Sequence, residues 1–194
     1  MNENVIYGTL PSDSIHPSES ELRARIGCPP ENIEGIDEIY AEVKKSLRPK
    51  YAYTFTDIKR YGEVLDLGFG KIFSRDLNKN LNGCRRACLL VVTLGSDTDR
   101  HLMKLSKVEP VDNYFADAIA SAFAESLIDE AERIALGDTP HKARYSIGYG
   151  DVPLHHQKEF LCRLDAEKTV GITLTERMLM IPSKSITAII GIKE

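Results

Sequence analysis

Hydrophobic positions recur at helical spacing in two long segments, residues 31–48 and residues 111–137. Pro49 and Gly137 fit the ends of these helices, because proline cannot continue a helix and glycine suits a C-terminal cap. The longer segment is rich in alanine, which lets neighbouring elements pack close to it. One stripe of this helix is predicted to face the core: Tyr114, Phe115, Ala118, Ile119, Ala122, Phe123, Ser126 and Leu127.

Two further helices are predicted from capping patterns. A Ser-x-x-Glu capping box that begins at Ser18 predicts a short helix over about 19–26. Ser96 and Asp97 are predicted to cap another helix that runs to about Lys107.

Strand-like segments lie between these helices. Residues 51–58 alternate aromatic and small side chains, which predicts a strand. Residues 87–95 form the most apolar short run, so a fully buried strand is favoured, although periodicity alone leaves a buried helix open. Short strands are predicted over 62–68 and 71–74, followed by a polar helical turn over 75–83.

No stretch of the chain is long and polar enough to separate two domains, which predicts one domain over residues 1–194. Residues 1–17 are polar, contain two prolines, and are predicted to form an extended N-terminal arm. No internal repeat or heptad pattern is present.

Composition narrows the class of protein. The chain has 28% charged and 42% hydrophobic residues with a net charge of −4, a balance typical of globular proteins that do not bind nucleic acid. No apolar run is long enough to cross a membrane, and the N-terminus has no signal-peptide pattern. A cytoplasmic protein is therefore predicted.

Cysteine and histidine do not predict a metal site. Cys84 and Cys88 lie four residues apart and could share a helix face, but no third and fourth ligand lies nearby in the sequence. Buried or inert thiols are therefore favoured. His155 and His156 are adjacent, and adjacent side chains on a helix point about 100° apart, so a surface pair is favoured. The usual hydrolase, kinase and nicotinamide motifs are also missing.

The segment 144–151 is the strongest candidate for a ligand site. Gly148 and Gly150 flank Tyr149, and glycine permits backbone conformations that bring amides close to a ligand. Arg144 precedes this turn, and a planar guanidinium suits a carboxylate. On spacing alone, a structural turn with the arginine in a surface ion pair is the favoured alternative.

Other polar residues border apolar runs in the same half of the chain. Glu125 lies at the edge of the long helix's apolar stripe, where a carboxylate is usually solvated but can also accept an amino group. Thr175 and Glu176 lie between two apolar runs, as at a strand–turn–strand joint. Ser183 and Lys184 follow in a turn before the last strand, and such turns supply hydroxyls and amides. For the segments around Thr175 and Ser183, an ordinary structural turn is again the favoured alternative to a ligand site.

Taken together, these pieces closely resemble the activation domain of vitamin B12-dependent methionine synthase. Residues 85–192 carry the resemblance, and residues 112–135 correspond to the family's long helix. The family pattern has proline in place of Ile147 and serine in place of Arg177. The Arg-x-x-x-Gly-Tyr signature and the residues after it keep the family's order: Arg144, Gly148, Tyr149, Pro153, Gln157, Leu164, Asp165, Gly171, Ile172, Leu174, Thr175, Glu176, Met180 and Pro182.

The resemblance implies an α+β fold with a twisted, mostly antiparallel sheet and long flanking helices. It also implies a site for S-adenosylmethionine and no catalytic residue of the chain's own. Arg144 would hold the ligand's carboxylate, Glu125 its amino group, the Ser146 backbone its adenosine part, and Tyr149 would line the pocket near the sulfonium. Gly148 would also belong to the binding site. Residues of the C-terminal part would line the pocket or face cobalamin: Thr175, Glu176, Ser183 and Lys184.

The chain has only the length of an activation domain, so the resemblance further implies a stand-alone subunit of a methyltransferase system for methionine biosynthesis. Cobalamin would be held mainly by a partner, a cobalamin-binding core methionine synthase or related corrinoid protein. A flavodoxin- or ferredoxin-type donor would supply electrons for reactivation. Two alternatives remain open: a module that serves another corrinoid methyltransferase, and a non-catalytic sensor or interaction protein.

Overall fold

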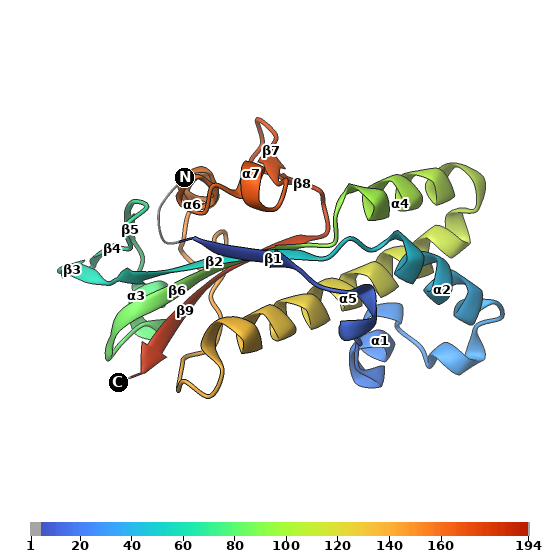
Figure 1. Ribbon diagram of the computed structural model, residues 1–194, viewed down its shortest axis with the longest axis horizontal. Coiled ribbons are helices and arrows are strands. Elements are labelled where there is room, and N and C mark those ends of the chain that lie inside the picture. The colour runs from blue at the N-terminus through green and yellow to red at the C-terminus, as the bar shows by residue number, and fades with distance from the viewer. Residues whose placement is uncertain (1–4, 194) are drawn as a thin grey trace.

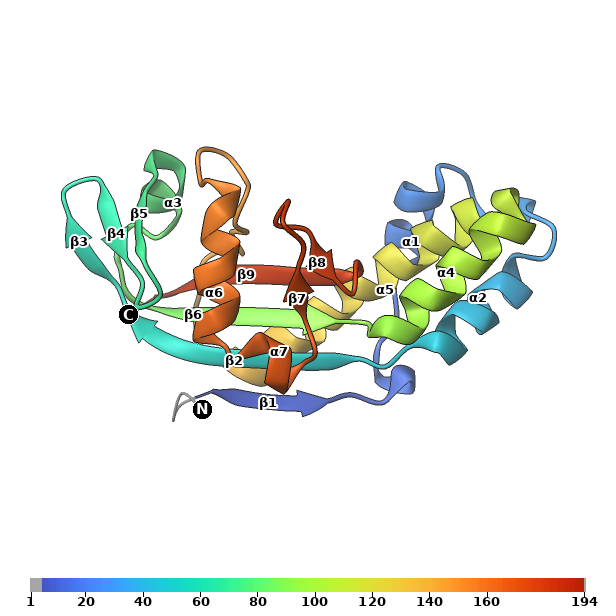
Figure 2. The ribbon, with the colours of Figure 1, turned by 90° about the horizontal axis from the view of Figure 1, so that it is seen from above.

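A four-stranded antiparallel sheet forms the centre of the molecule in the computed structural model, which describes residues 5–193. The strand order is β1-β2-β6-β9, and Figure 2 shows the strands side by side in that order. The strands comprise Ile6–Thr9 (β1), Lys50–Asp57 (β2), Cys84–Thr93 (β6) and Ser185–Lys193 (β9). The predicted α+β class with a mostly antiparallel sheet is confirmed.

The apolar run at residues 87–95 belongs to strand β6, between β2 and β9, so the buried-strand prediction is confirmed. Both faces of β6 are covered, and its side chains alternate between two hydrophobic cores. Leu90 lies in the core on the α5 face, whereas Leu89 lies in the core on the opposite face. This double burial explains why the run is continuously apolar rather than alternating.

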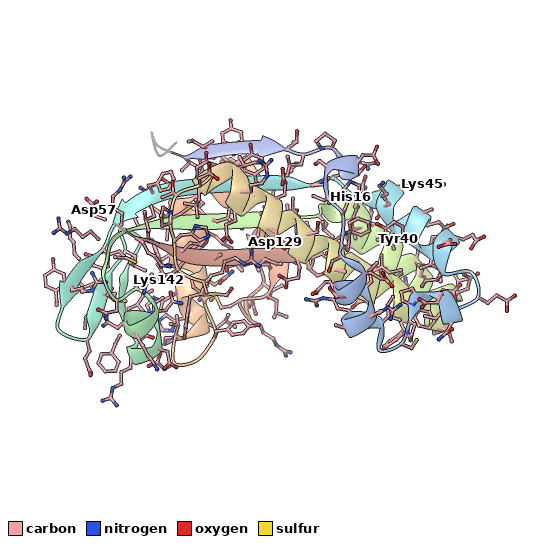
Figure 3. All side chains as sticks on the ribbon, turned by 90° about the horizontal axis from the view of Figure 1, so that it is seen from below. His16, Tyr40, Lys45, Asp57, Asp129 and Lys142 are labelled. Carbon is pink, nitrogen blue, oxygen red and sulfur yellow. The ribbon has the colours of Figure 1, made fainter. Side chains whose placement is uncertain are left out.

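Four helices pack into the first core: the longest lies on one face of the sheet, and the three shorter ones lie beyond the end of the sheet (Figure 1). They are α1 (Glu19–Ile26), α2 (Ile36–Ser46), α4 (Ser96–Val108) and α5 (Pro110–Leu136). Figure 3 shows α5 crossing the sheet diagonally, with Asp129 on the part of the helix that overlies the strands. The three shorter helices pack around the first half of α5.

The sequence predicted the length of α5 well but misplaced part of its buried surface. Phe123 is fully buried as predicted, whereas Tyr114 is 57% exposed. Alanines outside the predicted stripe, such as Ala116 and Ala120, are fully buried. The reason is that α5 contacts the sheet on one side and α1, α2 and α4 on others, so a single stripe cannot describe it.

Shorter elements form the second core with the opposite face of the sheet (Figure 1). The helices are α3 (Arg75–Asn80), α6 (Gln157–Arg163) and α7 (Ala166–Thr169). The strands are β3 (Lys59–Tyr61), β4 (Val64–Asp66) and β5 (Lys71–Phe73) in one small sheet, and β7 (Thr173–Leu174) and β8 (Met180–Ile181) in another. Single 3₁₀ turns occur at η1 (Ser12–Ser14), η2 (Pro30–Asn32) and η3 (Leu154–His156).

Two predicted helix starts need correction. The helix predicted from residue 31 begins only at α2, because Gly35 adopts a left-handed conformation (φ 75°) directly before it. Ser96 and Asp97 do not cap α4, since Gly95 occupies the N-cap position and no side-chain cap bond forms. Asp97 instead pairs with arginines. By contrast, the Ser18 cap of α1 is confirmed, because its hydroxyl accepts the Glu21 amide at 3.1 Å.

The N-terminal arm and the cysteines also have defined places. Strand β1, within the predicted arm, pairs antiparallel with β2, and residues 1–4 of that arm lie outside the described residues. Cys84 and Cys88 lie on a strand rather than a helix, and a register shift between Cys84 and Arg86 leaves their side chains in different cores. Burial and the negative charge of Glu132 raise the pKa of Cys88 to about 12, so its thiol stays protonated.

Within residues 5–193, no helix combines the length and the apolar character that crossing a membrane requires.

Candidate functional site

The segment 138–153 runs from the end of α5 along the edge of strand β9, and we call it the strap. The Tyr145 amide donates to the Ile189 carbonyl at 3.0 Å, and the Ile189 amide donates back at 2.8 Å. The Ser146 hydroxyl donates to the Thr187 carbonyl at 2.8 Å. These bonds fix the strap to the sheet directly before its glycine turn.

The glycine turn of the strap needs its glycines. Gly148 and Gly150 both have positive φ, 89° and 52°. A Cβ atom on Gly150 would collide with the Tyr145 hydroxyl and the Asp76 carboxylate. The Tyr145 hydroxyl also donates to the Tyr149 carbonyl at 3.1 Å, and this bond links the two ends of the turn.

Asp151 fastens the end of this turn to the start of α3. Its carboxylate accepts hydrogen bonds from the Ser74 hydroxyl and from the Arg75 amide, the latter at 2.7 Å. These bonds hold the pKa of Asp151 below its ordinary value, and the bond from Ser74 has the largest effect. The strap is thus anchored on both sides of the turn that presents Tyr149.

A groove of about 670 Å³ lies between the strap, α5, α6 and the loop that carries β7 and β8. This volume is within the range of about 300–1,000 Å³ that is usual for small-molecule sites. Tyr149 is 70% exposed and stands at its rim with exposed Leu154 and Leu179. The polar lining residues are Glu125, Arg144, Tyr145, Ser146, Tyr149, Gln157, Ser183, Ser185 and Thr187, and the apolar ones are Ile147, Leu154, Met178, Leu179, Met180 and Ile186.

One wall of the groove carries opposite charges. Arg144 from the strap faces α5, where its Nη1 atom donates to Asp129 at 2.5 Å and to Glu132 at 2.9 Å. Its Nη2 atom lies 3.9 Å from Oε2 of Glu125. Burial lowers the pKa of Arg144, but the bonds to Asp129 and Glu132 outweigh it and raise the pKa above the ordinary value. The guanidinium is therefore a permanent cation at this wall.

The structure brings together Glu125, Arg144, Ser146, Tyr149 and Ser183, five of the residues that the sequence singled out. They come from α5, the strap and the turn before β9, which are far apart in the chain. The remaining four predicted residues are not among those that line the groove: Gly148, Thr175, Glu176 and Lys184.

Thr175 and Lys184 have other contacts. The Thr175 hydroxyl accepts the Leu179 amide at 3.1 Å and so stabilises the turn between β7 and β8, while Glu176 is exposed. Lys184 points toward α5, where its ammonium donates to the Ser121 hydroxyl and pairs with Asp117, both at 2.8 Å.

The loop before β9 is held by α4. The Ser183 amide and hydroxyl donate to the Asp99 carboxylate at 2.7 and 2.8 Å. This loop begins with a cis peptide bond between Ile181 and Pro182. Asp99 and Lys184 together fix the loop to both α4 and α5, so the Ser183 side of the groove has a defined shape.

Sequence reasoning missed Gln157 as a site residue. Gln157 is buried at the floor of the groove, where its amide donates to the Thr187 hydroxyl at 3.2 Å and contacts the Met180 sulfur at 3.1 Å. A glutamine in the first turn of a short helix is normally solvated. Its place in the family pattern was the one signal in the sequence, and that pattern gave the position no role in the site.

Among residues 5–193, no group of three or more His, Cys, Asp or Glu side chains is arranged to hold a metal ion. The His155 and His156 rings lie next to each other, with centroids 4.2 Å apart. Burial and the neighbouring His155 lower the pKa of His156.

Fold and groove together define an α+β domain with a ligand-sized groove between a helix, a strap and a C-terminal turn. The family model of the vitamin B12-dependent methionine synthase activation domain matches residues 87–194, more than half of the chain, so the chain belongs to this family. The resemblance seen in the sequence is thereby confirmed.

A solved structure shares the fold over nearly the whole chain. It is a crystal structure of the MetH reactivation domain bound to AdoHcy, with a TM-score of 0.68 and 15% sequence identity. The similarity covers 96% of this chain and 78% of that chain. No curated protein matches the chain.

Proposed function

We propose that this chain is a subunit that binds S-adenosylmethionine and supports reactivation of cob(II)alamin in a separate B12-dependent methionine synthase. One observation carries the proposal: a domain of the activation family has a groove whose wall combines the Glu125 carboxylate and the Arg144 guanidinium. The solved structure of similar fold was determined with AdoHcy, the demethylated form of this ligand.

The groove offers chemistry suited to each part of S-adenosylmethionine. Arg144 would take the ligand's carboxylate and Glu125 its ammonium, because an amino-acid end needs one cation and one anion. The exposed ring of Tyr149 offers an electron-rich face for the sulfonium. The backbone at Ser146 lies beside the groove and would contact the adenosine part. Thr175, Glu176, Ser183 and Lys184 are proposed to line the pocket or to face cobalamin, and of these Ser183 lies in the groove.

Cobalamin would be held mainly by the partner, a core methionine synthase or a related corrinoid protein. One electron from a flavodoxin- or ferredoxin-type donor would reduce cob(II)alamin to cob(I)alamin. Transfer of the methyl group from S-adenosylmethionine to the cobalt would then make the reduction irreversible and leave S-adenosylhomocysteine. The chain's own residues bind and orient the methyl donor in this scheme.

The same groove would serve two other functions. One is delivery of S-adenosylmethionine to a different corrinoid methyltransferase, and the other is sensing of this ligand without any methyl transfer. Reactivation assays with a cob(II)alamin-loaded methionine synthase and with a different cob(II)alamin-loaded methyltransferase separate all three, because each delivery function restores only its own partner and sensing restores neither.

The first test is calorimetric titration of the protein with S-adenosylmethionine. Arg144→Ala is expected to weaken binding by about 2–5 kcal/mol, because the ligand's carboxylate would lose its charged partner on a partly buried wall of the groove. Arg133→Ala is the matched control, since Arg133 lies on α5, is 70% exposed and pairs with Glu130 on the same helix. Unchanged affinity of a folded Arg144→Ala protein would remove Arg144 from the site.

A further inference from the structure

Glu125 and Arg144 are each held by one end of their charged group. Oε1 of Glu125 accepts a hydrogen bond from Nη2 of Arg25 at 3.1 Å, while Oε2 points toward Arg144. Nη1 of Arg144 donates to Asp129 and Glu132, while Nη2 points toward Glu125. The two facing atoms are 3.9 Å apart, too far for a hydrogen bond.

Arg25 reaches Glu125 from helix α1. Its Nε atom donates to Glu21 on the same helix at 2.5 Å, which orients the guanidinium toward α5. Helix α1 itself is fixed on α5 by buried Ile26 and by Leu22. Arg25 therefore presents a positioned cation to the outer oxygen of Glu125.

Asp129 and Glu132 play the corresponding part for Arg144. They follow Glu125 by four and seven residues, so all three carboxylates lie on one face of α5. Glu132 is itself held from its other oxygen by His141, at 2.8 Å. The guanidinium is thus drawn along the helix, away from Glu125.

We infer that Arg25, Asp129 and Glu132 are positioning residues that keep Glu125 and Arg144 apart and open to one zwitterionic amino-acid group. The inference rests on the proposed function, in which that group is the methionine end of S-adenosylmethionine. Glu125 and Arg144 carry opposite charges, already lie within ion-pair distance at 3.9 Å and, without these anchors, would close into a hydrogen-bonded salt bridge. A ligand would then have to break that bridge before it could bind, whereas the anchored pair needs no rearrangement.

Arg25→Gln is the most informative test because two explanations predict opposite signs. Loss of a positive charge beside the groove would, by charge alone, tighten binding of the cationic ligand. Loss of a positioning residue is expected to weaken binding by about two- to fivefold, the range for a partly exposed ion pair. Arg23→Gln is the matched control, since Arg23 lies on α1 and pairs with Glu19 and Glu31, away from the groove.

A second ligand separates positioning from a general structural role. 5′-Methylthioadenosine has the adenosine part but no amino-acid group, so its affinity should be the same for wild type and Arg25→Gln. Asp129→Asn, at an exposed position, should show the same ligand selectivity, with Glu130→Gln as its control on α5. The unfolding temperatures of the ligand-free variants should match those of the controls.

Titration calorimetry with the two ligands gives decisive outcomes. Weaker binding of S-adenosylmethionine alone, with unchanged unfolding temperature, supports the inference. Equal or tighter binding by Arg25→Gln overturns it, as does a parallel loss for both ligands or a lowered unfolding temperature. If wild-type protein binds no S-adenosylmethionine, the proposed function and this inference both fail. If wild-type protein binds the ligand but Arg25→Gln does not weaken binding, only this inference fails.

Discussion

Single residues of the strap decide how the groove is shaped. Asp151 connects the glycine turn to α3 through Ser74 and the Arg75 amide, although its own side chain is not buried. Its charge strengthens these hydrogen bonds, because a carboxylate accepts more strongly than a neutral group. The turn that carries Tyr149 therefore depends on the ionised form of one carboxylate.

Asp151 should make stability depend on pH in the acid range. Its pKa in the folded protein lies below the ordinary value of 3.8. The stabilisation is therefore fully present above 3.8 and is lost as the pH falls through the lower, folded-state pKa. Free energies of unfolding of wild type and Asp151→Asn, measured by denaturant titration across this range, should differ at neutral pH and converge in acid.

Asp57→Asn is the control for this pH dependence, because Asp57 is an exposed carboxylate at the end of β2. Its difference from wild type should stay small at every pH. A difference for Asp151→Asn that persists unchanged in acid would contradict the assigned role of the charge.

At this scale the sequence predicted the groove's principal residues only in part. The type and spacing of Arg144, Gly148 and Tyr149 indicated a turn at a ligand site. Glu125 was a candidate from its place at the edge of an apolar stripe, and the family resemblance gave it a role. Arg25 could not be predicted, because one hundred positions of chain separate it from Glu125 and only the packing of α1 on α5 brings them together. Local patterns do not encode such contacts.

Individual helices and strands were more predictable than their boundaries. Capping and periodicity identified α1, α5 and β6, since each depends on local hydrogen bonds or on a strong apolar pattern. The late start of α2 at Gly35 could not be predicted, because apolar residues continue at helical spacing on both sides of this glycine.

The N-cap of α1 offers a test at the scale of an element. Ser18→Ala removes the acceptor for the Glu21 amide and should lower the free energy of unfolding by about 0.5–2 kcal/mol. Ser18→Thr keeps a hydroxyl acceptor and should lose much less. Chemical denaturation measures both. Equal losses for the two variants would show that the cap hydrogen bond is not what stabilises α1.

At the scale of the molecule, strand β6 joins the two cores. Long-range pairing with β2 and β9 places residues from both halves of the chain in one sheet, with α5 on one face and α6 on the other (Figures 1 and 2). Sequence patterns predicted which segments are strands, but they could not give the order β1-β2-β6-β9. That order depends on contacts between distant segments.

Because β6 belongs to both cores, the chain is predicted to unfold as one domain. Leu90→Ala leaves a cavity in the α5 core and Leu89→Ala leaves one in the opposite core; both side chains are fully buried. Each substitution should cost about 2–5 kcal/mol of unfolding free energy. Far-ultraviolet circular dichroism and tyrosine fluorescence should report the same single transition for wild type and both variants, because neither core can persist without the shared strand.

Met103→Ala on α4 is the control for these core substitutions, because Met103 is 60% exposed and its loss should change stability by no more than about 0.5 kcal/mol. Two separate transitions would contradict the single-domain prediction, and a variant in which only one probe shifts would identify the core that unfolds alone. Coincident transitions instead mean that both cores unfold together. The groove has residues from α5 and from the strap, so it would be lost in the same single transition. Ligand bound at the groove would then stabilise the entire chain and not merely the strap.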